Sequence, residues 1–131
     1  MDNLLRRALL LDATASGSMG ALFALLSRPL SALLGLPAGL LHWVGLFLIP
    51  FAAFLVWLAR RPLVPPSLVY SVIIGNVLWV VGSAAIIPTG MVSPSPLGTV
   101  VVLAQAVAVV VFASLEYSGM RRSELAQQLN R

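Results

Sequence analysis

The sequence contains no cysteine and only one histidine, and both shortages exclude classes of site. Without cysteine among its 131 residues, the chain can form no disulfide, thiolate metal site or iron–sulfur cluster. The one histidine, His42, cannot complete a bis-histidine haem site or a zinc site within a single chain. We therefore expect no cofactor and no bound metal ion.

Charged residues are also scarce. They make up 9% of the chain, against about 25% in a soluble domain, whereas hydrophobic residues make up 60%. The eight basic residues are all arginine and stand in small groups at the ends of apolar runs. This distribution is typical of membrane proteins rather than of nucleic-acid-binding surfaces. We expect an integral membrane protein whose partner is the lipid bilayer, with no nucleic acid partner.

Four apolar runs are long enough to cross about 30 Å of hydrocarbon at 1.5 Å per residue. Segments rich in proline, glycine and arginine separate them, and these connections are short enough to make neighbouring helices antiparallel. We predict an all-α fold, an integral membrane four-helix antiparallel up-down bundle, as one transmembrane domain of residues 1–131. The predicted spans are about 8–26, 38–59, 67–87 and 97–117, followed by a short cytoplasmic tail at 118–131.

The arginines predict the orientation of these spans. With four spans, seven of the eight arginines lie on one side of the membrane, and Arg28 alone lies on the other. Because basic residues concentrate on the cytoplasmic side, both termini should be cytoplasmic. The seven are Arg6, Arg7, Arg60, Arg61, Arg121, Arg122 and Arg131.

The first span carries small residues at every fourth position. Ser16, Gly20 and Ala24 form one such series, and a second runs from Ala13 to Ala21. Small residues at this spacing let two helix backbones approach closely. The series predicts a packing face within the bundle, and a dimerisation face is the alternative.

Two carboxylates are expected at one level near the cytoplasmic side. Asp12 and Glu116 each lie about one turn inside the predicted membrane boundary. Intramembrane charges normally have partners, so we expect a cluster in which they pair with arginines such as Arg61 and Arg121. The alternative is a shared site for a proton or a cation.

A second group of polar residues is expected near the midplane. Asn76 and Gln105 reach similar depths on the third and fourth spans, and Pro50 leaves the Leu46 carbonyl without its helical donor. An Asn–Gln hydrogen bond that also reaches that carbonyl would join three helices. The alternative is a small pocket for a polar solute. The candidate residues for this layer or site are Asn76, Gln105, Trp79 and Ser83.

Four stretches of the chain resemble an uncharacterised family of small bacterial inner-membrane proteins with four spans. They are "LDATASGSMG", "LLGLPAGLL", "GNVLWVVGS" and "EYSGMRR". The resemblance implies a bacterial four-span membrane protein and implies no activity, because none is assigned to that family.

No catalytic constellation is present, since the sequence has no HExxH motif, no P-loop and no Rossmann glycine pattern. We therefore expect a non-enzymatic accessory or scaffold protein that forms a homo-oligomer or joins a larger membrane complex. The alternative is a small transporter or pore for a polar solute, built on Asn76, Gln105 and Trp79.

Overall fold

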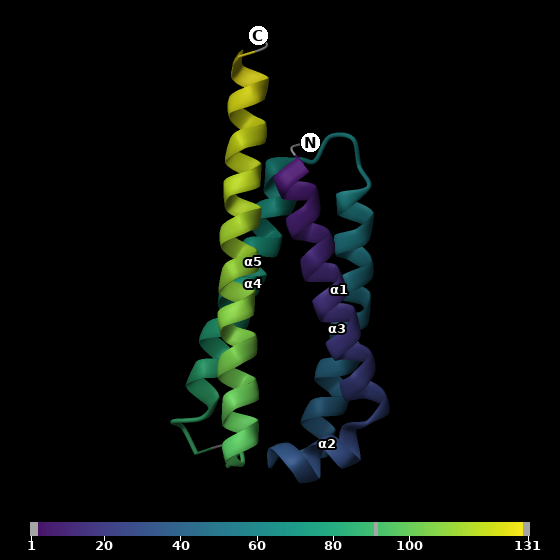
Figure 1. Ribbon diagram of the computed structural model, residues 1–131, viewed down its shortest axis with the longest axis vertical. Coiled ribbons are helices and arrows are strands. Elements are labelled where there is room, and N and C mark those ends of the chain that lie inside the picture. The colour runs from purple at the N-terminus through teal and green to yellow at the C-terminus, as the bar shows by residue number, and fades with distance from the viewer. Residues whose placement is uncertain (1–2, 91, 130–131) are drawn as a thin grey trace.

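The computed structural model describes residues 3–90 and 92–129, and within these ranges the protein is all-helical (Figure 1). Four of its helices are long and apolar enough to cross a membrane. The prediction of an all-α fold is thereby confirmed. The helices are α1 (Asn3–Leu25), α2 (Ser27–Leu34), α3 (Ala38–Ala59), α4 (Pro66–Ile86) and α5 (Pro96–Leu129).

Proline and glycine set most of these boundaries. Pro37 precedes α3, and α4 and α5 begin at Pro66 and Pro96. Proline is tolerated in a first helical turn because its missing N–H would have no intrahelical partner there. Gly35 ends α2 with a φ of 69°, in the left-handed region where glycine carries no steric cost.

The observed helices differ most from the predicted spans near the two ends of the chain. α1 begins at Asn3 rather than at residue 8, and α5 continues past residue 117. α3 has the predicted bounds and α4 begins one residue earlier than predicted. α5 continues through the predicted tail to Leu129, and its C-terminal part projects beyond the other helices (Figure 1). At 34 residues α5 is about 51 Å long, longer than the hydrocarbon layer. Arg131 lies outside the described residues.

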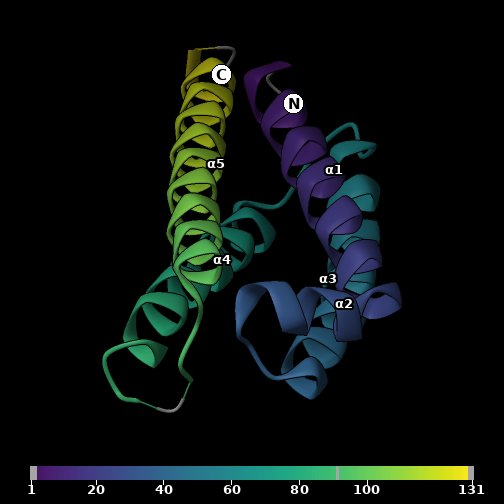
Figure 2. The same ribbon diagram turned by 60° about the horizontal axis from the view of Figure 1, so that its bottom comes forward.

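The helices form two pairs that diverge from each other. α1 packs along α3, and α4 packs along α5. The pairs meet where α1 contacts α5, while the backbones of α3 and α4 do not pack together in the described part of the chain. Figures 1 and 2 show the two pairs side by side, with α2 at the end opposite the N-terminus.

Glycines allow the close approach of α1 and α3. A Cβ added to Gly45 would lie 2.5 Å from the Ala24 backbone nitrogen and 2.6 Å from the Gly20 carbonyl oxygen. A Cβ added to Gly20 would lie 2.9 Å from the Leu48 Cβ. The small-residue series that includes Gly20 and Ala24 therefore packs against α3 within the protein, as its spacing predicts.

The two pairs are held together at both ends of the molecule. At the N-terminal end of α1, a Cβ on Gly119 would lie 2.5 Å from the Leu5 backbone nitrogen. At the other end Ser95 donates its backbone N–H to the Leu34 carbonyl at 2.9 Å, and a Cβ on Gly98 would overlap that carbonyl oxygen. α2 thus connects the first helix pair to the start of α5.

Candidate functional site

Asp12, Asn76 and Glu116 form a buried polar group where three helices meet. The Asn76 side-chain amide nitrogen on α4 donates to Asp12 Oδ2 on α1 at 3.1 Å and to Glu116 Oε1 on α5 at 3.0 Å. Asp12, Asn76 and Glu116 are only 1%, 5% and 0% exposed. One amide therefore holds two carboxyl groups together in the interior of the protein.

The two carboxyl groups are not equivalent. Ser16 donates to Asp12 Oδ1 at 3.1 Å, so both oxygens of Asp12 accept a hydrogen bond. Glu116 Oε2 is buried and has no hydrogen-bond partner among the described residues. Donors on both oxygens favour an ionised carboxylate, whereas a buried group with one free oxygen favours the protonated acid. The geometry suits an ionised Asp12 beside a neutral Glu116.

The expected pairing of these carboxyl groups with arginines is wrong. Among the described residues, neither carboxyl group forms a salt bridge. Arg121 instead lies 3.7 Å from Glu124, and the Arg61 guanidinium lies 4.9 Å from the centre of the Trp57 ring. The reason is direction, because Asp12 and Glu116 lie on the buried faces of their helices while Arg121 is exposed.

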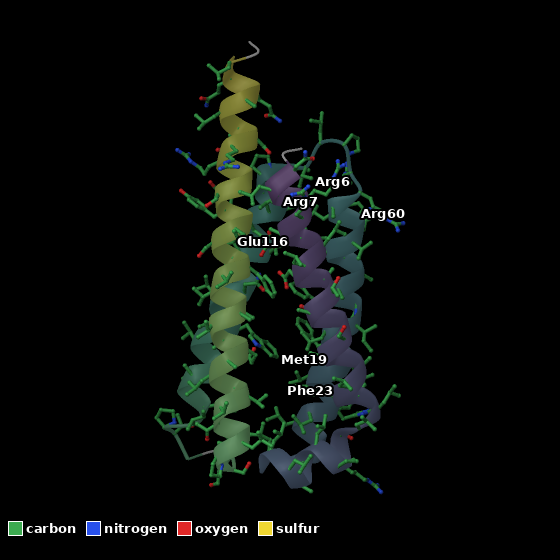
Figure 3. The ribbon with its side chains drawn as sticks, in the orientation of Figure 1. Arg6, Arg7, Met19, Phe23, Arg60 and Glu116 are labelled. Atoms are coloured by element: carbon green, nitrogen blue, oxygen red, sulfur yellow. The ribbon has the colours of Figure 1, made fainter. Side chains whose placement is uncertain are left out.

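The buried faces explain why the carboxyl groups meet. On α1 the buried positions include Leu5, Leu9 and Asp12, which recur every three or four residues. On α5 Glu116 is followed on the same buried face by Gly119. Close packing of Gly119 on Leu5 brings these faces together. Figure 3 shows Glu116 on the α5 side of this junction.

The carboxyl groups lie at the level of the middle of α4. Asn76 is ten residues after Pro66 in a helix of 21 residues, about 15 Å along its axis. Hydrogen bonds to Asn76 place Asp12 and Glu116 at this level. The positions of Asp12 and Glu116 on the buried faces follow the helical period of their sequences. Their shared contact with Asn76 depends instead on which helices pack together.

The expected bond between Asn76 and Gln105 is not formed. Gln105 Oε1 instead accepts a hydrogen bond from the Trp79 indole nitrogen at 2.7 Å. The Leu46 carbonyl takes no part in either hydrogen bond. The backbone of α3 packs along α1. The expected single layer is therefore two groups, one around Asn76 and one that joins Trp79 to Gln105.

A cavity of about 110 Å³ connects these two groups. It lies between the helix pairs, and its polar lining comes from Asp12, Ser16, Asn76 and Gln105. A neighbouring cavity of about 300 Å³ shares Trp79 and Gln105 and includes Ser83. In Figure 3 Met19 and Phe23 lie on the side of α1 that faces α5, and Met19 borders both cavities.

The remaining charges gather away from this site. Arg6, Arg7 and Arg60 lie at the end of the molecule where the N-terminus lies (Figure 3). No group of three or more histidine, cysteine, aspartate or glutamate side chains suited to a metal ion occurs among the described residues. Comparison with protein-family models, with curated proteins and with solved structures gives no match.

Proposed function

We propose that the protein is a small multi-pass membrane transporter that exchanges protons for a solute at the Asp12–Asn76–Glu116 group. The observation that carries this proposal is the burial of two carboxyl groups on one amide with no arginine partner in the described structure. Ionisable groups inside a membrane are costly and are usually found where protons or substrates move. A purely structural role would be served by the arginines that are nearby in the sequence.

In this proposal Asp12 is the group that exchanges its proton. Asp12 lines the cavity between the helix pairs, whereas Glu116 is not part of the lining and is reached through Asn76. Glu116 keeps its proton and is therefore uncharged. Asn76 holds the carboxyl groups of Asp12 and Glu116 together by hydrogen bonds. The proton and the solute then compete for binding at the Asp12 carboxylate.

The membrane arrangement belongs to the same proposal. The four long helices span the bilayer as an antiparallel up-down set, with both termini in the cytoplasm of a bacterium. The gathering of Arg6, Arg7 and Arg60 at one end supports this orientation. The two helix pairs contact each other through α1 and α5 and, at the other end, through α2 and α5, with the cavity between these contacts.

Proton flux in proteoliposomes tests the function. A panel of cationic, neutral and anionic aromatic solutes is added outside vesicles that contain a pH-sensitive dye. We expect at least one class to drive proton movement in the wild-type protein and not in Asp12→Asn. The Glu124→Gln variant, which removes a carboxyl group outside the site, is the control. If no class of solute moves protons, the transport proposal is wrong.

An accessory or scaffold role is the second candidate. It is favoured by the apolar face of α4 that no other helix covers, where Ile74, Leu78 and Val81 are exposed. A second copy of this chain would bury such a face. Purification in a mild detergent tests this role, because a strictly monomeric protein without partners would contradict it.

A further inference from the structure

We propose that the solute is an organic cation that carries an aromatic or aliphatic group, and that it binds in the cavity between the two helix pairs. This inference rests on the proposed transport function and names the substrate class of the same site. It is carried by the charge of the cavity, by the side chains around it and by its continuation into a second cavity.

The charge of the cavity selects a positive ligand. Among the residues that the structure describes, Asp12 is the only charged one that lines the cavity, and Asn76 joins its carboxylate to Glu116 by hydrogen bonds. Glu116 does not line the cavity and keeps its proton, so the negative charge comes from Asp12. With no arginine in the lining, an anionic ligand would meet only repulsion there.

Aromatic side chains from both helix pairs line the same cavity as this carboxylate. Phe47 and Phe51 come from α3, Trp79 from α4 and Phe112 from α5. The rings of Phe47 and Phe51 are stacked, with centroids 6.2 Å apart and an interplanar angle of 12°. Aromatic faces attract ammonium groups, and a desolvated contact of this kind contributes up to about 2 kcal/mol.

The rest of the lining selects an apolar body for the ligand. Most of its surface is hydrocarbon, and the Gln105 carbonyl oxygen is already occupied by the Trp79 indole. Few polar groups therefore remain to hydrate a small inorganic ion. Beyond Trp79 the cavity of about 300 Å³ continues along apolar side chains that include Phe23 and Val44. A cation with an extended apolar group can occupy both spaces.

Charge and proton balance follow from the carboxyl groups. When Asp12 is protonated, the pair is neutral and the cavity holds no net charge. Entry of one monovalent cation releases the Asp12 proton, so one positive charge replaces another. Glu116 retains its proton in both states. Binding should therefore weaken as the pH falls.

Binding of benzyltrimethylammonium to the purified full chain tests the substrate class. Trp43→Phe and Trp57→Phe leave Trp79 as the only tryptophan, whose fluorescence then reports on the cavity. We expect saturable binding that weakens at least tenfold in Asp12→Asn and at low pH. Phe112→Leu should weaken it by about 3- to 30-fold, which is the range of one cation–π contact. Glu124→Gln should bind like the parent protein.

Two comparison ligands test whether binding requires the positive charge of the probe. Benzyl alcohol and benzenesulfonate share the ring of the probe and carry no charge or a negative charge. If either binds as tightly as the cation, or if Asp12→Asn leaves binding of the cation unchanged, the proposed substrate class is wrong. Solute-driven proton flux that persists with neutral or anionic solutes alone would overturn this inference and leave the transport function standing.

Discussion

Asn76 joins the three helices of the site through its side-chain amide. Its nitrogen supplies one hydrogen bond to Asp12 and one to Glu116, and all three side chains are buried. A buried acceptor left without a donor costs about 1–3 kcal/mol. The stability of the site therefore depends on an uncharged group rather than on an ion pair.

Replacement of Asn76 should consequently destabilise the protein more than removal of a carboxyl group. In Asn76→Leu two carboxyl oxygens lose their donor, and we expect unfolding in detergent to become easier by about 2–4 kcal/mol. Glu116→Gln removes no donor and should leave stability unchanged or higher, because a buried ionisable group is lost. Thermal unfolding monitored by circular dichroism gives both values.

Ser71→Ala is the control for this comparison. Ser71 is an exposed polar residue on the same helix, and its hydroxyl bonds only to the Ser67 carbonyl one turn earlier. Its replacement should change stability by less than about 0.5 kcal/mol. Equal stability of Asn76→Leu and Ser71→Ala would contradict the role assigned to Asn76.

The sequence identifies the individual residues of the site better than their contacts. Asp12, Glu116, Asn76, Gln105 and Trp79 all stand out as polar or amphipathic groups in apolar runs. Depth along each helix can be counted, but the direction in which a side chain points depends on the partner helix. This is why the predicted ion pairs of Asp12 and Glu116 with arginines are wrong, because arginines such as Arg121 lie on exposed faces.

At the scale of elements, the pairing of α1 with α3 depends on glycine. The backbones approach so closely at Gly20 and Gly45 that a single methyl group would meet backbone atoms of Ala24. Backbone atoms cannot move aside as a flexible side chain can. This contact fixes the first helix pair and, through α1, the position of Asp12.

Gly45→Ala should therefore destabilise the protein, by about 1–3 kcal/mol, because the added methyl group overpacks the interface. Gly82→Ala is the matched control, since a Cβ there meets nothing within 4 Å. Alanine is the better helix former, and Gly82→Ala should stabilise α4 by up to about 1 kcal/mol. Detergent unfolding curves compare the two, and equal shifts would contradict the close contact.

The element boundaries were the most predictable part of the fold. Apolar runs end where proline or glycine interrupts them, and these signals act within a few residues of the chain. The short helix α2 lies between the first two predicted spans and was not predicted as a separate helix, because its eight residues carry too little pattern to separate them from the end of α1. The extension of α5 follows from helix-forming residues beyond the apolar run.

At the scale of the whole molecule, the contact between the first and last helices determines the site. α1 and α5 are separated by most of the chain, yet Gly119 packs on Leu5 and brings Glu116 beside Asp12. Short connections limit the order of helices but do not decide which of them touch. The two-pair arrangement, and with it the cavity, could therefore not be predicted from the sequence.

The proposed orientation makes a prediction about the two faces of the molecule. Because the chain has no cysteine, single cysteines can be introduced without background. Thr89→Cys and Gln128→Cys place exposed thiols near opposite ends. In intact cells a membrane-impermeant maleimide should label Thr89→Cys and not Gln128→Cys, and both should react after lysis. The reverse pattern would contradict cytoplasmic termini.

The central claim is that Glu116 keeps its proton under conditions in which Asp12 has released its own, and infrared spectroscopy over a series of pH values tests it most directly. A protonated carboxyl group in an apolar site has a carbonyl stretch that is distinct from the bands of carboxylates and amides. The account predicts that the Asp12 band disappears first as the pH rises, and that one band then remains in the wild-type protein, is absent in Glu116→Gln and persists in Asp12→Asn. A wild-type spectrum in which no band remains, or a band that remains in Glu116→Gln, would contradict it.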